Sequence, residues 1–266
     1  MAGLTGKTIA SNYKSLLRVD DDSNGIDGTL ETVTDGEGTA SAIKLSDDNL
    51  TVRPNNDDRT NALGVRQKAG NYVFTADTTN SVVRAGVGQF NVLTQYAYFG
   101  INYLDFSHPA ANTHYAIPFM AASGGGSSTN NVDFGTGTDP DDTFTTADTA
   151  SQYASQIAPM MWLVPDNISI DSVSSIEGGD NATGDTTRMH LKSFTFNSGS
   201  TSCLTGGALL AHNSDVTNAG NEQAYKTDWT VDSASVSAGI VILAFFRGDS
   251  NNADYSINII VKYHLV

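Results

Sequence analysis

The chain has 266 residues, a formal net charge of −15 and only 14 Lys and Arg residues. A surface that binds nucleic acid needs Lys and Arg to displace counterions from phosphates, and an anionic membrane attracts the same residues. The charge therefore argues against both partners. Cys203 is the only cysteine, which excludes an intrachain disulfide and a cysteine-based zinc site.

The composition favours β-structure. Hydrophobic residues make up 39% of the chain and charged residues 16%. Gly, Ser, Thr, Asn and Asp fill the remainder, so the sequence predicts an all-β fold of short strands joined by polar loops. Residues 1–8 lack the apolar stretch of a Sec signal, and no run approaches the roughly 18 apolar residues of a transmembrane helix. We expect a chain that is made in a cytosol and is not inserted into a membrane.

The sequence predicts an N-terminal arm at residues 1–30. Ile9, Tyr13, Leu16 and Leu17 recur at helical spacing, which predicts a short helix. The acidic run at residues 20–22 would lie at the wrong end of that helix for its dipole. An extended arm is therefore the alternative.

Residues 31–90 predict a small β-rich stem. Turn-forming residues separate short strands here, which we expect at Ile43 and Leu45, at Leu50 and Val52, at Tyr72 and Phe74, and at Val83, Ala85 and Val87. These strands are too short and too sparsely apolar to build a core alone. Such segments usually pair with other chains, so the stem predicts a homo-oligomer.

Residues 91–266 predict a knob of jelly-roll or β-sandwich type. We expect nine strands, at residues 92–103, 114–119, 160–164, 168–176, 187–196, 208–212, 226–231, 240–246 and 255–263. The run at 240–246 is apolar throughout and should be covered on both faces, as happens when the outer face meets another subunit. The last strand alternates, with Tyr255, Ile257 and Ile259 on its apolar face. The glycine-rich residues 124–131 and the acidic segment up to Asp148 predict a long exposed loop.

One segment matches a calcium-binding loop. Residues 20–31 fit the pattern D-x-[DN]-x-[DN]-G-x5-E. Asp20, Asp22 and Asn24 would offer side-chain oxygens, Gly25 the turn, Ile26 its carbonyl and Glu31 a bidentate carboxylate. Asp27 occupies a position that is normally apolar, and the residues after Glu31 cannot form the exiting helix. We expect an acidic surface turn, with calcium binding as the open alternative.

The other polar residues predict no enzyme chemistry. The histidines at 108, 114, 190, 212 and 264 lack metal-ligand spacing, and a nucleophile elbow, a dinucleotide fingerprint and a phosphate-binding loop are absent from the sequence. Asp139, Asp141 and Asp142 could imitate a glycosidase acid pair, but a solvated loop explains them better. The aromatic residues at 96, 98, 99, 103 and 106 could form a sugar platform and are more often core. We expect no catalytic, cofactor-binding or metal-binding residues.

Two stretches resemble a known class of protein. The sequence GKTIASNYKSLLRV at residues 6–19, followed by TDGEGTASAIKLS at 34–46, resembles the N-terminus of many fibre and virion structural proteins of tailed bacteriophages, especially marine phages. The segment from WLVPD at 162–166 to ASVSAGIV at 234–241 is similar to their jelly-roll knobs. The resemblance implies a trimer with an N-terminal virion anchor and an outward knob.

This resemblance gives the functional expectation. We expect a trimeric capsid cement or decoration protein, also called a head fibre, which is assembled in the host cytoplasm and bound to the major capsid protein or other virion proteins through residues 1–30. The alternative is a short tail fibre or receptor-binding protein that contacts a host surface glycan. A glycan-binding module or glycan hydrolase outside virions is a third reading.

Overall fold

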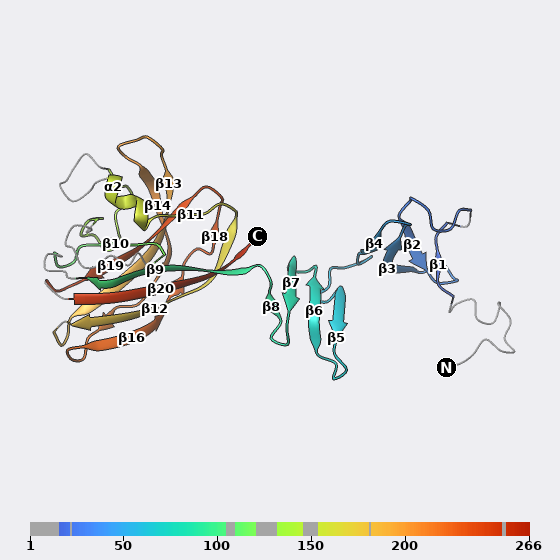
Figure 1. Ribbon diagram of the computed structural model, residues 1–266, viewed down its shortest axis with the longest axis horizontal. Coiled ribbons are helices and arrows are strands. Elements are labelled where there is room, and N and C mark those ends of the chain that lie inside the picture. The colour runs from blue at the N-terminus through green and yellow to red at the C-terminus, as the bar shows by residue number, and fades with distance from the viewer. Residues whose placement is uncertain are drawn as a thin grey trace. The chain divides into compact units, whose positions relative to one another are not determined.

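The computed structural model describes residues 16–21, 23–104, 110–120, 132–145, 154–180, 182–251 and 254–266. The fold is all-β, as predicted, and divides into two compact units, residues 1–93 and 94–266 (Figure 1). This division lies close to the expected boundary between stem and knob. No helix among the described residues is long and apolar enough to cross a membrane.

The first unit contains two antiparallel four-stranded sheets. Short turns connect their strands. In one of them, the Asp35 carboxylate accepts hydrogen bonds from the backbone N–H groups of Glu37 and Thr39, both at 2.9 Å. The first sheet contains β1 (Arg18–Val19), β2 (Glu31–Thr34), β3 (Ala40–Leu45) and β4 (Leu50–Val52). The second, called the stem sheet here, contains β5 (Leu63–Arg66), β6 (Tyr72–Asp77), β7 (Val82–Ala85) and β8 (Phe90–Asn91).

The arm prediction falls largely on residues that the structure does not describe, including Ile9 and Tyr13. Leu16 and Leu17 are exposed and lead directly into β1, which pairs with β2. The predicted helix therefore does not continue through Arg18 and Val19.

The second unit is a β-sandwich of two antiparallel sheets. The seven-stranded sheet contains β10 (Tyr115–Ile117), β11 (Trp162–Leu163), β13 (Thr186–Phe196), β14 (Leu204–His212), β15 (Val216–Thr217), β17 (Thr230–Val231) and β19 (Val241–Gly248). The five-stranded sheet contains β9 (Thr94–Leu104), β12 (Ile168–Asp180), β16 (Gln223–Asp228), β18 (Ser235–Val236) and β20 (Asp254–Leu265). Figure 1 shows β9, β20, β12 and β16 side by side.

The main core lies between these two sheets. Ile257 and Ile259 from β20 belong to the same buried cluster as Met189 and Leu191 from β13. The alternation predicted for β20 is therefore correct. The strand predicted at residues 226–231 is divided at Trp229, which is buried and donates a hydrogen bond from Nε1 to Ser175 Oγ at 2.9 Å. Here the chain leaves the five-stranded sheet as β16 and enters the seven-stranded sheet as β17.

Strand β19 is buried on both faces, as its apolar sequence predicted. Ile242, Ala244 and Phe246 belong to the cluster between the sheets, and Val241, Leu243 and Phe245 belong to a second cluster on the outer side. The cover over that second cluster comes from the same chain, through residues 132–145, α2 (Ala154–Ile157) and η2 (Ala158–Met160). This strand therefore gives no support for a neighbouring subunit.

The prediction of a long exposed loop after residue 124 is wrong for its described part. Val132, Phe134 and Phe144 are almost completely buried against the seven-stranded sheet. Their burial compensates for ordering an otherwise polar segment. Residues 124–131 and 146–148 lie outside the described part of the chain.

Candidate functional site

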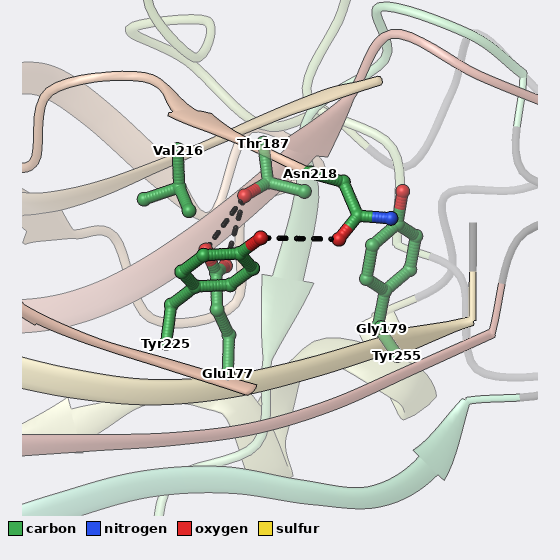
Figure 2. Close-up of a pocket in the computed structure, with 7 residues that line it drawn as sticks. All are labelled: Glu177, Gly179, Thr187, Val216, Asn218, Tyr225 and Tyr255. Atoms are coloured by element: carbon green, nitrogen blue, oxygen red, sulfur yellow. Dashed lines mark hydrogen bonds between the residues drawn. The ribbon is translucent and has the colours of Figure 1, made fainter. Parts of the chain in front are cut away.

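Among the described acids of the second unit, Glu177 at the end of the sandwich has the largest pKa shift. Glu177 on β12 and Thr187 on β13 bring the two sheets together there. Thr187 Oγ1 lies 2.8 and 2.9 Å from the two carboxylate oxygens of Glu177 (Figure 2). Only 3% of Glu177 is exposed. Burial raises the pKa of its carboxyl to about 7, against the opposing effect of the Thr187 hydrogen bond.

The space beside Glu177 is very small. The cavity has a volume of about 10 Å³, which is roughly the room that one water molecule needs. Figure 2 shows the side chains of Tyr225 and Asn218 beside the acid, joined by a hydrogen bond of 3.3 Å. General acid catalysis needs a substrate within hydrogen-bond reach of the carboxyl. This geometry supports a buried structural acid rather than acid–base chemistry on a bound molecule.

Three basic side chains hold the acidic segment at residues 135–142 against the seven-stranded sheet. We call these three side chains the clamp. Lys192 Nζ donates to the carbonyl oxygen of Pro140 at 2.7 Å and forms an ion pair with Asp142. His190 Nε2 lies 3.2 Å from Asp139 Oδ1. His114 Nε2 lies 3.1 Å from the carbonyl oxygen of Gly137.

The two histidines of this clamp are uncharged at neutral pH. Their ring centroids lie 5.1 Å apart. Burial lowers the pKa of His114 to about 4 and that of His190 to about 3. The expectation of a free solvated loop is therefore wrong, although Asp139, Asp141 and Asp142 are exposed as expected. Asp139 and Asp142 pair with His190 and Lys192 of the same chain, which supports an anchored segment rather than a glycosidase acid pair.

A polar cavity of about 290 Å³ lies at strand ends of the same sheet, beside the start of β13 and the end of β19. Its charged groups are engaged within the chain: Arg188 Nε pairs with Asp215 at 2.7 Å, and Arg247 Nη2 donates to Asn112 Oδ1 at 2.8 Å. Asp249 accepts hydrogen bonds from the backbone N–H and the hydroxyl of Thr186. These bonds stabilise strand ends and assign no reaction to the cavity.

The calcium-like segment forms ordinary turns in its described residues. Asp21 Oδ1, rather than an oxygen of Asp20, accepts hydrogen bonds from the backbone N–H groups of Ser23 and Asn24 at 2.7 and 3.0 Å. Asp27 Oδ1 accepts from the N–H of Thr29 at 2.7 Å. Asp22 lies outside the described residues. In the part of the chain that the structure describes, no three acidic, His or Cys residues form a group that could hold a metal ion.

The aromatic residues of β9 divide between core and surface. Phe99 is fully buried, so the core interpretation is correct for it. Tyr96 and Tyr98 are 53% and 41% exposed, and the core interpretation is wrong for them. The side chain of Tyr103 and all of Phe106 lie outside the described residues.

The stem sheet has a wholly apolar face. Directly paired residues lie on one face, and residues two apart along a strand share that face. The register pairs Leu63 with Ala76, Ala76 with Val83, Val65 with Phe74, Phe74 with Ala85, and Ala85 with Phe90. These seven residues define what we call the stem face.

The stem face has little cover within the chain. Leu63, Val65 and Phe90 are 44%, 53% and 71% exposed. In the described part of the first unit, Val33 is the only buried hydrophobic side chain. The opposite face of the stem sheet is mostly polar, and there Arg84 pairs with the buried Asp77 at 3.6 Å. Exposed apolar faces of this kind are typical of interaction surfaces.

Comparisons with known proteins give no family. No family model and no curated protein match the sequence. Among solved structures, the Eiger TNF from S. frugiperda matches at 10% identity with a TM-score of 0.28, over 65% of this chain and 93% of that chain. A TM-score this low gives no basis for assigning a fold or a function.

Proposed function

We propose that this chain is a structural protein of a tailed bacteriophage virion, built as a homotrimer with a shared β-stem. The main support for an oligomer is the exposed stem face. A four-stranded sheet with one apolar face needs a second layer. Because the described part of the first unit supplies no second layer, identical faces from other copies provide it in this proposal.

The trimer and the virion come from the resemblance of residues 6–19 and 34–46 to phage fibre proteins. Three copies would direct their stem faces toward one symmetry axis and keep the polar faces in solvent. Closed rotational symmetry gives every copy the same contacts and leaves no apolar face uncovered. The net charge of −15 per chain keeps such trimers soluble at the high local density of a particle surface.

Within the virion we propose the head. The chain would then be a capsid decoration protein or head fibre that binds the major capsid protein through its N-terminal residues. A short tail fibre whose knob contacts host glycan is the second candidate, favoured by the exposed Tyr96 and Tyr98, since tyrosines recur at recognition surfaces. The proposal includes no enzyme activity, because the cavity at Glu177 has room for about one water molecule and the charged groups of the larger polar cavity are engaged within the chain.

Immunogold labelling of purified particles separates these candidates. We expect gold over the head facets. Gold confined to the tail would replace the head proposal with the tail fibre, and its absence from particles would refute a virion role. Release of reducing sugar by the purified protein would instead support the glycan hydrolase.

The anchor has its own test. Deletion of residues 1–15 leaves β1 in place and should give a folded trimer that no longer joins particles. The full-length chain, expressed in the same way, is the control. Normal incorporation of the shortened chain would show that residues 1–15 are not required for anchoring.

A further inference from the structure

Two arginines lie side by side on the outer face of the seven-stranded sheet. Arg188 on β13 and Arg247 on β19 are directly paired in the register. Their strand neighbours Met189 and Phe246 are buried between the two sheets, so both arginines lie on the opposite face by alternation. Directly paired Cβ atoms are about 4.5–5.5 Å apart, and like charges at such positions destabilise a sheet. In a chain with only 14 Lys and Arg residues, this pairing calls for a physical reason.

Both arginines line the polar cavity of about 290 Å³ at the ends of β13 and β19. The described residues around this cavity are all polar: three threonines, two arginines and two aspartates. Ligand pockets usually have volumes of roughly 300–1,000 Å³ and a mainly apolar lining. The cavity is therefore close to the small end of that range. Its lining suits a compact ligand that is polar over its whole surface.

Contacts within the chain orient the two guanidinium groups. Arg247 Nη2 donates to Asn112 Oδ1 at 2.8 Å, and the backbone N–H of Asn112 donates to the carbonyl oxygen of Gly248 at 2.7 Å. Arg188 Nε lies 2.7 Å from Asp215 Oδ1, in an ion pair that lacks the direction of a hydrogen bond. Because each guanidinium carries five N–H donors, these contacts leave most of the donors of both groups to a ligand.

Arg247 has no acidic partner within ion-pair distance among the described residues. Asp215 is paired with Arg188. Asp249 also lines the cavity, but its two oxygens accept hydrogen bonds from the backbone N–H and the hydroxyl of Thr186, at 2.7 and 2.6 Å. A carboxylate that enters between the two guanidinium groups would relieve their repulsion and accept charge-assisted hydrogen bonds from both.

The two aspartates restrict the kind of anion that the cavity accepts. With them, the charged side chains around the cavity sum to zero, so a doubly charged phosphate or sulfate would be repelled by the aspartates as well as attracted by the arginines. A hydroxyl group, by contrast, can donate a hydrogen bond to a carboxylate oxygen. A ligand with one carboxylate and several hydroxyl groups therefore matches the whole lining, whereas an inorganic oxyanion matches only the arginines.

From this pair of arginines in a polar cavity, we propose that the second unit carries a binding site for a carboxylated sugar, of the size of one uronic acid residue. The carboxylate lies between Arg188 and Arg247, and the sugar hydroxyls face Thr138, Asp215 and Asp249. All of these residues belong to the second unit. The proposal is therefore independent of the trimer and of the place of the protein in a particle.

Binding of small molecules to the full-length chain tests this site. The probes are sodium glucuronate, glucose and sulfate, which offer a carboxylate with hydroxyls, hydroxyls alone, and an inorganic oxyanion. Titration calorimetry gives the dissociation constant of each probe. Thr138→Glu adds a negative charge at an exposed position of the cavity lining without changing the sheet. Thr143→Glu makes the same change at an exposed position outside the described lining and is the matched control.

We expect glucuronate to bind at least about tenfold more tightly than glucose or sulfate, since one hydrogen bond to a charged group changes affinity by about that factor. Thr138→Glu should weaken glucuronate binding by at least about tenfold, and Thr143→Glu should leave it unchanged. Arg247→Gln should weaken it as much as Thr138→Glu, and circular dichroism reports whether this variant keeps its strands.

Two kinds of result would overturn the proposal. Sulfate or glucose that binds as tightly as glucuronate would refute the assignment to a carboxylated sugar. The absence of glucuronate binding to the wild type, or glucuronate binding that Thr138→Glu leaves unchanged, would refute the site itself. Both results come from proteins with an unaltered sheet, so they do not depend on the folding of Arg247→Gln.

Discussion

Replacing Phe90 by alanine should dissociate the trimer without unfolding the chain. Full burial of a phenylalanine side chain contributes up to about 3 kcal/mol, and 71% of Phe90 is exposed in the single chain. Its burial at the stem axis would then contribute about 2 kcal/mol per copy and about 6 kcal/mol per trimer. This corresponds to a change of about 10⁴ in the association constant. Because the ring is mostly exposed, its loss costs the isolated chain little.

Sedimentation equilibrium over a wide range of protein concentration measures this association constant directly. The matched control is Phe196→Ala, which removes a ring that is 42% exposed on the second unit. Circular dichroism at the same concentrations reports whether each variant keeps its strands. The reasoning fails if Phe90→Ala stays folded and associates as tightly as the wild type, or if Phe196→Ala weakens association equally.

Three further predictions concern the polar groups of the chain. The pKa of Glu177 is raised from 4.5 to about 7, so its contribution to stability is fully present below pH 4.5 and is lost as the pH rises through 7. At pH 8 the free energy of unfolding of Glu177→Gln should therefore exceed that of the wild type by up to about 3 kcal/mol, and equal values would contradict the raised pKa. Lys192→Met should speed proteolytic cleavage within residues 135–142 and lower the free energy of unfolding by about 1–2 kcal/mol. An unchanged rate of cleavage would show that the clamp does not hold this segment in place. Chelation and Glu31→Ala should leave the melting temperature unchanged, and a drop that calcium reverses would establish a metal site at residues 20–31.

Local patterns predicted the strands of the second unit well. The alternation along β20 and the continuous apolar run of β19 each depend on neighbours within one strand, and both matched the structure. The source of the cover over β19 was not predictable. Phe134 and Phe144 stand isolated among polar residues and show no period that marks them as core.

The clamp was missed for a similar reason. His190 and Lys192 occupy the outward positions of β13, where an isolated strand would place them in solvent. They are buried because residues 135–142 fold back over them. The available signal was β19 itself: a strand that is apolar on both faces implies that the outer side of its sheet is covered.

The stem face could be anticipated only in outline. The scarcity of apolar residues at 31–90 pointed to missing partners, but the strand β5 was not predicted because Leu63 and Val65 flank a glycine. Only the register shows that Leu63, Val65 and Phe90 share one face with Phe74. Pairing between strands is a tertiary property, and a single sequence gives little information about it.

The mass of the purified full-length chain in solution tests the central claim most directly. One chain has a mass of 28.1 kDa. At micromolar concentration, light scattering should give the mass of three chains, unchanged on dilution until the stem dissociates. A folded protein that has the mass of one chain at this concentration would contradict the shared stem and the virion role that depends on it.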